Sequence, residues 1–155
     1  MGIDMDILYM AFKGNSNSSK VLLDYVASDN KLYLTNSFKT SVVELQKELK
    51  KNNYDLIVTF GQALLDRDTL KIEITAKNDS VYSTSFDYRF LYHKLKKEYK
   101  VMVSNDAGNY LCNHIYYHGL KYIKENNLKT KMIFIHIPKI EKITDIGRLS
   151  ELFHM

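Results

Sequence analysis

The sequence contains one cysteine, no glycine-rich phosphate loop and no long apolar run, and each absence excludes a class of protein. One cysteine forms no internal disulfide, and it excludes a Cys-rich zinc site. No segment approaches the roughly 20 apolar residues that a membrane-spanning helix needs. The first ten residues, MGIDMDILYM, lack the basic region and the apolar stretch of a secretory signal. The sequence therefore predicts a soluble, cytoplasmic protein that does not insert into membranes.

Basic residues are in slight excess, but they form no arginine-rich stripe. The 22 Lys and Arg residues exceed the 18 Asp and Glu residues, which gives a net charge of +4 and a pI near 9.0. The lysines are spread over several segments that also carry acids, and no platform of alternating basic and aromatic residues occurs. This pattern favours a solvated surface over a nucleic-acid-binding one.

Length and composition are those of one globular domain. The chain has 155 residues, of which 45% are hydrophobic and 26% are charged. A chain of this size buries enough surface to fold without a disulfide or a structural metal. No internal repeat, low-complexity tract or linker divides it. We therefore expect a single domain that covers residues 1–155.

Short apolar runs alternate with helical patterns along the chain. Continuous apolar runs predict strands that are buried on both faces, at 7–12, 56–60, 101–103 and 132–137. The run 32–34 predicts an edge strand, and 69–76 alternates like a half-buried strand. Helices are expected at 19–27, at 109–126 and at 145–153. A further helix at 86–98 has Phe90, Leu91 and Leu95 facing inward, and a capping box of Ser41 and Glu44 opens another.

This alternation predicts a three-layer α/β/α sandwich with a mostly parallel, mixed central sheet. In such sheets, functional groups gather beyond the carboxyl ends of the strands. Cys112 follows the run 101–103 in the expected first turn of the long helix, where the partial positive charge lowers the pKa of a thiol. His136 lies near the carboxyl end of the last strand. Glu73 points to the face opposite Ile72 and Ile74.

These three residues supply a nucleophile, a base and a carboxylate that can orient the base. Each residue type also has an ordinary structural role. A lone cysteine commonly acts as a small buried hydrophobe, a histidine in a strand as a core imidazole, and a glutamate as a solvated acid. Their order along the chain does not identify a triad, so spacing alone leaves both interpretations open.

Three longer motifs surround these residues. Residues 104–114, SNDAGNYLCNH, resemble the nucleophile motif S-x-x-A-G-x-[FY]-[VL]-C-N-H of the pyroglutamyl peptidase I (pyrrolidone-carboxylate peptidase) family of cysteine peptidases. Residues 134–138, FIHIP, resemble the histidine motif F-I-H-[VI]-P of that family. Residues 60–63, FGQA, with Glu73 and Asn78 after them, resemble its V-G-Q-A-G-G-R and E-R-V-A-I-N words. The likeness runs from residue 7 to residue 138 and indicates a compact, diverged member.

The resemblance implies that Cys112 is the nucleophile, His136 the general base and acid, and Glu73 the carboxylate that orients His136. Four residues match positions near the lactam ring of the substrate: Phe12, Gln62, Tyr110 and Leu111. The implied reaction removes an N-terminal pyroglutamyl residue from a peptide or small amide through a thioester, without a metal or organic cofactor. Family members often associate, so the resemblance also implies a homo-oligomer as one state of the protein.

The chain departs from the family pattern in several places, among them the Gly-Gly-Arg after the glutamine, which has become LLDR at 64–67. The N-terminal motif has become AFKGN at 11–15, without the proline and without the second aromatic wall of the ring pocket. Tyr9 and Tyr82 are candidates for a replacement wall. The long loop that comes after Asn78 in the family is missing. Two alternatives therefore stay open: a thiol amidase for another blocked or cyclic amide, and a non-catalytic binding protein on the same scaffold.

His114 and His118 are four residues apart on the long predicted helix, a spacing that can hold a metal ion. No third ligand is evident in the sequence. We therefore expect no metal site.

Overall fold

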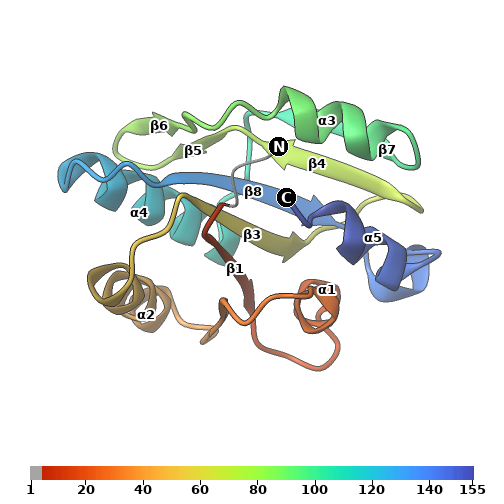
Figure 1. Ribbon diagram of the computed structural model, residues 1–155, viewed down its shortest axis with the longest axis horizontal. Coiled ribbons are helices and arrows are strands. Elements are labelled where there is room, and N and C mark those ends of the chain that lie inside the picture. The colour runs from red at the N-terminus through yellow and green to blue at the C-terminus, as the bar shows by residue number, and fades with distance from the viewer. Residues whose placement is uncertain (1–4) are drawn as a thin grey trace.

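The computed structural model describes residues 5–155, so the first four residues of the predicted domain lie outside the described part. Figure 1 shows a central sheet with helices on both of its faces. The sheet has six strands in the order β2-β1-β3-β8-β4-β7, and β5 and β6 form a separate hairpin. Strands β1–β2, β1–β3, β3–β8 and β4–β7 pair in parallel, whereas β4 pairs with β8 in the antiparallel direction. The predicted mixed, mostly parallel sheet is thus confirmed.

The strands are β1 (Ile7–Phe12), β2 (Lys31–Leu34), β3 (Leu56–Gln62), β4 (Thr69–Glu73), β5 (Thr75–Lys77), β6 (Val81–Ser83), β7 (Lys100–Ser104) and β8 (Lys131–Ile137). The helices are α1 (Ser18–Tyr25), α2 (Phe38–Lys51), α3 (Arg89–Lys96), α4 (Leu111–Glu125) and α5 (Ile146–Leu152), with a 3-10 turn at Ile140–Lys142. Within the described residues, no helix has the length and apolar character needed to cross a bilayer.

Two apolar cores, one on each face of the sheet, hold the layers together. Alternate residues of each central strand point to opposite faces, so Val58 belongs to one core and its neighbour Ile57 to the other. The first core packs against α1, α3 and α5, and the second packs against α2 and α4. Because both faces are covered, the central strands read as continuous apolar runs, as predicted for β1, β3 and β8.

The structure corrects two predictions of burial. The run 101–103 is not a buried strand: it forms β7 at the edge of the sheet, where Met102 is 43% and Val103 42% exposed. An apolar run does not reveal whether a neighbouring strand will cover it. In α3, Leu91 and Leu95 face inward as expected, but Phe90 points outward and is 73% exposed.

Helix α2 begins earlier than the capping box predicts. Its N-cap is Ser37, whose hydroxyl accepts a hydrogen bond from Thr40 N–H. Ser41 lies inside the helix, and Glu44 accepts hydrogen bonds from the backbone and the hydroxyl of Thr35 instead. A serine four residues earlier thus fulfils the capping role, and Glu44 joins the β2–α2 loop to the helix.

The predicted strand 69–76 is also divided. β4 ends at Glu73, and β5 begins at Thr75 as the first strand of the β5–β6 hairpin. The three residues of β6 are too few to show a periodicity that predicts a strand. As a result of this break, Glu73 is the last residue of a strand in the central sheet.

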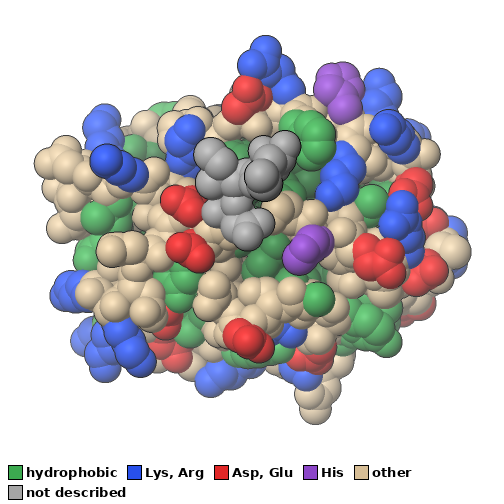
Figure 2. Space-filling model, in the orientation of Figure 1, with side chains coloured by type: hydrophobic (Ala, Val, Ile, Leu, Met, Phe, Trp, Pro, Cys, Tyr) green, Lys and Arg blue, Asp and Glu red, His purple; other side chains and the backbone are tan. Residues whose placement is uncertain are grey.

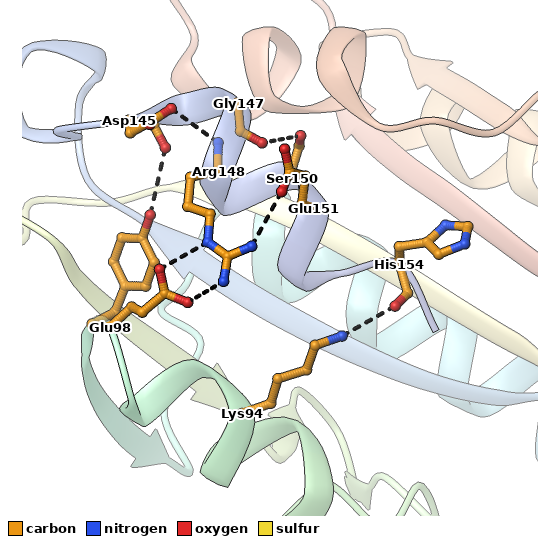
Figure 3. A network of polar contacts seen from close by, with 9 residues as sticks. Lys94, Glu98, Asp145, Gly147, Arg148, Ser150, Glu151 and His154 are labelled. Atoms are coloured by element: carbon orange, nitrogen blue, oxygen red, sulfur yellow. Dashed lines mark hydrogen bonds and ion pairs between the residues drawn. The ribbon is translucent and has the colours of Figure 1, made fainter.

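A network of polar contacts connects α3 to α5 (Figure 3). The Arg148 guanidinium donates to both carboxylate oxygens of Glu98, at 2.8 and 2.5 Å, and to Glu151 at 3.1 Å. Lys94 of α3 donates to the carbonyl of His154 beyond α5. The Arg148 contacts lower the pKa of the Glu98 carboxyl. The groups are exposed to solvent, so we expect salt to weaken this network.

The charged side chains are dispersed over the surface. Figure 2 shows basic groups scattered among acidic ones on the viewed face, without one large basic patch. This distribution agrees with the interpretation of the lysines as a solvated surface.

Candidate active site

One row of residues crosses the sheet near the carboxyl ends of β3 and β8. Gly61 of β3 pairs with His136 of β8, which lies opposite Lys71 of β4, and Lys71 pairs in turn with Met102 of β7. Residues paired across a sheet point to the same face. Phe134, two residues before His136, belongs to the core under α4, so the whole row faces α4.

His136 and Glu73 form a buried hydrogen-bonded pair. The distance from His136 Nδ1 to Glu73 Oε2 is 2.7 Å, and both side chains are buried. Lys71 Nζ lies 3.7 Å from the same carboxylate oxygen, and the Tyr116 hydroxyl donates to the backbone carbonyl of Glu73. Since the carboxylate engages Nδ1, the other ring nitrogen, Nε2, is left for proton transfer.

Gly61 makes room for the thiol beside this pair. Cys112 is the second residue of α4, and a Cβ built on Gly61 would lie only 2.7 Å from its Sγ. The thiol therefore rests against the backbone of the residue that pairs with His136. Among the described residues no hydrogen bond joins Sγ to the imidazole, an arrangement common in catalytic sites without bound substrate. The fold thus brings Cys112, His136 and Glu73 to one end of the sheet.

The electrostatics of the thiol differ from the sequence prediction. Burial raises the pKa of Cys112 to about 12, and the negative charge of Glu73 contributes in the same direction. The prediction of a lowered pKa from the helix N-terminus was wrong, because burial disfavours the charged thiolate. The resting group is a neutral thiol, which needs a base to become a nucleophile.

The start of α4 presents unpaired backbone donors beside the sulfur. The N-cap residue, Tyr110, makes no side-chain capping bond, and the first helical hydrogen bond runs from His114 N–H to Tyr110 C=O. The N–H groups of Leu111 and Cys112 consequently have no hydrogen-bond partner within the described residues. Such donors suit an oxyanion that forms next to Sγ.

A cavity of about 210 Å³ opens on the β1 side of Cys112. Its lining includes all four residues expected around a substrate ring, namely Phe12, Gln62, Tyr110 and Leu111. Gln62 Oε1 accepts a hydrogen bond from Ser18 N–H at 2.9 Å, so its amide nitrogen remains for a ligand. The walls combine apolar surface with a few polar groups, as small-molecule sites usually do.

Three polar residues of this cavity were missed by sequence reasoning: Asn17, Ser19 and Asn36. Asn17 is the N-cap of α1 and also donates to the carbonyl of Phe12. Asn36 donates to the carbonyl of Lys13, which connects the β2–α2 loop to the loop after β1. In sequence these residues resemble ordinary loop and cap formers. Only the parallel pairing of β1 and β2 brings the two loops together.

Neither tyrosine considered as a replacement wall lies in this cavity. Tyr9 belongs to the opposite core, where its hydroxyl donates to the carbonyl of Phe153. Tyr82 packs edge-on against Tyr117 beneath the hairpin. The aromatic ring that contacts Tyr110 is instead Phe38, at the start of α2, with the two ring centres 5.4 Å apart.

The His114–His118 pair lies outside this cavity. The two ring centres are 4.4 Å apart, and His114 Nε2 lies 3.1 Å from the carbonyl oxygen of Phe38. Within residues 5–155, no cluster of three or more His, Cys, Asp or Glu side chains has the geometry to hold a metal ion.

Comparisons with known proteins agree with one another. The family model described as pyroglutamyl peptidase matches residues 65–149. A pyrrolidone-carboxylate peptidase of Brachyspira hyodysenteriae is 33% identical over 139 residues, which cover 74% of this chain and 69% of that protein. Pyrrolidone-carboxylate peptidase 1 of Caldanaerobacter subterraneus is 29% identical over 131 residues, or 70% of this chain and 64% of that protein. The chain thus spans about two thirds of the length of these relatives.

Solved structures support the same fold. Pyroglutamyl peptidase I of Bacillus amyloliquefaciens superposes with a TM-score of 0.82 at 19% identity, covering 97% of this chain and 94% of that one. Pyrrolidone carboxyl peptidase of Thermococcus litoralis gives a TM-score of 0.76 at 18% identity, covering 92% and 80%.

Proposed function

The chain belongs to the pyroglutamyl peptidase family, and we propose that it removes the N-terminal pyroglutamyl residue from peptides by cysteine-based acyl transfer. The observation that carries the proposal is the buried bond between His136 Nδ1 and Glu73 Oε2, with the Cys112 thiol seated over Gly61 beside it. A free catalytic thiol suits the reducing cytoplasm, where we expect the protein to act.

In the first half of the reaction, Cys112 Sγ attacks the pyroglutamyl carbonyl carbon. As the C–S bond forms, the thiol proton passes to His136 Nε2, and Glu73 stabilises the resulting imidazolium. The N–H groups at the start of α4 hold the oxyanion. His136 then donates its proton to the leaving nitrogen, and the C–N bond breaks to leave a thioester on Cys112.

In the second half, water attacks the thioester and gives a proton to His136. The tetrahedral intermediate collapses, which releases pyroglutamate and returns the proton to the cysteine sulfur. The high pKa of Cys112 supports this use of His136 as a base, because few thiolates exist at neutral pH without one.

The neutral lactam ring fits the cavity beside Cys112. Phe12 and Leu111 supply apolar walls, and the free amide nitrogen of Gln62 is a hydrogen-bond donor for a lactam carbonyl. Phe12 at the end of β1 is an aromatic wall, and the short loop after it supplies no second one. Loss of one aromatic contact removes about 1–3 kcal/mol of packing. We therefore expect a raised KM for small pyroglutamyl amides.

The test is release of a reporter amine from a pyroglutamyl amide, with prolyl and alanyl amides as controls. We expect hydrolysis of the pyroglutamyl substrate alone, and none by Cys112→Ser. Turnover of a prolyl or alanyl amide in preference would identify a different amidase. A folded protein that hydrolyses none of the three would contradict the proposal and favour a binding role.

A further inference from the structure

The row that contains His136 continues onto an open part of the sheet. On the β1 side the row is covered, and Phe12 is buried under α2 and α4. On the other side, beyond β8, Lys71 is partly exposed and Met102 is 43% exposed. Since Lys71 pairs with both His136 and Met102, all three point to the face that α4 covers only in part.

In the proposed function, the acyl group of the substrate lies on one side of His136 and the leaving peptide on the other. The role inferred for Lys71 rests on that function. The cavity lined by Phe12 and Gln62 takes the acyl group. His136 donates its proton to the leaving amine, so the leaving peptide has to pass next to the imidazole. The side of His136 that is not occupied by the acyl cavity is the open side that carries Lys71.

Lys71 presents a positive charge with free donors on this path. Its Nζ lies 3.7 Å from Glu73 Oε2, which is an ion pair but too long for a hydrogen bond. Within the described residues, Nζ makes no hydrogen bond, and the side chain is 27% exposed. His136 engages Glu73 Oε2, and Glu73 Oε1 has no hydrogen-bond partner among the described residues, so Lys71 pairs with this carboxylate through charge alone. Its three N–H donors therefore remain for another anion.

We propose that Lys71 determines specificity on the leaving side, by binding the carboxylate of an acidic residue that comes directly after the pyroglutamyl group. The exposed surface of Met102 lies next to Lys71. In this arrangement it contacts the methylene groups of the acidic substrate residue. The preferred substrates are accordingly peptides that begin with pyroglutamyl-glutamate or pyroglutamyl-aspartate.

The experiment compares two substrates that differ only in charge: pyroglutamyl-glutamate amide and pyroglutamyl-glutamine amide. Blocking the C-terminus leaves the side chain as the only carboxylate. We expect kcat/KM for the glutamate substrate to exceed that for the glutamine substrate by about fivefold at low salt, the size expected of a partly exposed ion pair. The ratio should fall towards one as the NaCl concentration rises.

Variants assign the preference to Lys71. Lys71→Met should bring the ratio to about one, whatever it does to the rate itself, because the ratio compares two substrates on one enzyme. Lys71→Arg should keep the preference. Lys50→Met removes an equal charge at an exposed position in the last turn of α2 and should also keep the preference.

The outcomes separate this inference from the proposed function. Hydrolysis of both substrates at equal rates, or a preference that persists in Lys71→Met or at high salt, would overturn the role of Lys71 and leave the peptidase activity standing. Absence of hydrolysis of every pyroglutamyl amide would overturn both.

Discussion

At the scale of single residues, Gly61 is the position at which the sheet and the nucleophile meet. Its missing side chain leaves the space that Cys112 Sγ and the ring of Phe134 fill. In Gly61→Ala, the new Cβ would approach both groups at 2.7 Å, and Phe134 is fully buried. We expect a loss of about 1–3 kcal/mol in the free energy of unfolding and a large fall in kcat. Urea denaturation and the amidase assay measure the two effects.

The control is Gly147→Ala in α5. There the nearest atom to the added Cβ is 3.5 Å away, and alanine favours the helix by about 1 kcal/mol. This variant should therefore be fully active and at least as stable as the parent. Equal behaviour of the two variants would contradict the role given to Gly61.

The raised pKa of Cys112 leads to a second prediction. A pKa of about 12 leaves little thiolate at neutral pH, so iodoacetamide should alkylate the folded protein on the order of 100-fold more slowly than the protein in urea. The rate should increase with pH up to the point at which the fold is lost. Alkylation at pH 7 as fast in the folded as in the unfolded state would refute this account of the thiol.

The carboxylate of Glu73 leads to a third prediction. In Glu73→Gln the amide oxygen can still accept the hydrogen bond from His136, because the two side chains have the same size. The negative charge that stabilises the imidazolium is lost. We expect kcat to fall by about 10²- to 10⁴-fold with little change in KM. Steady-state kinetics test this, and circular dichroism checks the fold. A variant with an unchanged kcat would remove Glu73 from the mechanism.

Sequence reasoning reached the reactive residues because their motifs are local. Cys112 and His136 each lie in a short sequence motif that is recognisable on its own. Lys71 and Asn36 lie in no such motif. Strand register brings Lys71 near the site, and the packing of two loops brings Asn36 there. Side chains that are placed by pairing across the sheet are not visible in a linear pattern.

At the scale of elements, the side chain of Asn113 in α4 makes two hydrogen bonds to the backbone of the β5–β6 hairpin, beside the packing of Tyr82 on Tyr117. Asn113, the residue after the cysteine, accepts a hydrogen bond from Lys77 N–H and donates to Lys77 C=O. In Asn113→Ala both backbone groups lose their partner. We expect a loss of about 1–3 kcal/mol in unfolding free energy and faster amide exchange in the hairpin.

Asn126→Ala is the matched control, because Asn126 is exposed and bonds only within its own helix end. It should change stability by about 0.5 kcal/mol or less. If the hairpin amides exchange equally in both variants, Asn113 does not hold the hairpin.

The elements that sequence patterns predicted best are those whose burial is complete. β1, β3 and β8 lie in the interior of the sheet under helices on both faces, so most of their positions are buried and apolar or small. β7 has a similar apolar sequence, but it is the edge strand of the sheet. It is exposed because no further strand of the described residues pairs with its outer side. β6 has only three residues, and only its pairing with β5 makes it a strand.

At the scale of the whole molecule, buried tyrosines limit stability at high pH. Burial raises the pKa of Tyr9 to about 12, and burial with the nearby Glu48 carboxylate raises that of Tyr54 to about 12. An unfolded tyrosine ionises near pH 10. Between these values the folded state holds protons that the unfolded state has lost, so the unfolding free energy falls as the pH rises from 10 to 12.

Tyr9→Phe tests this directly. The variant loses the hydrogen bond to Phe153, at a cost of about 1 kcal/mol at pH 7, but it also loses one titrating group. Its stability should fall by about 2–3 kcal/mol less than that of the parent between pH 10 and 12. Tyr25→Phe, at an exposed site, should leave the slope unchanged. Parallel pH curves for Tyr9→Phe and the parent would disprove the assignment.

The place of β8 in the sheet has a consequence for biosynthesis. This strand is translated after the seven other strands, yet it lies between β3 and β4 and joins the two halves of the sheet. Until it leaves the ribosome, the nascent chain exposes two unpaired strand edges, a state that chaperones bind and that aggregates readily. Since β8 also carries His136, the emerging polypeptide gains its base only when the sheet closes, so a chain stalled before β8 has a thiol but no catalytic centre.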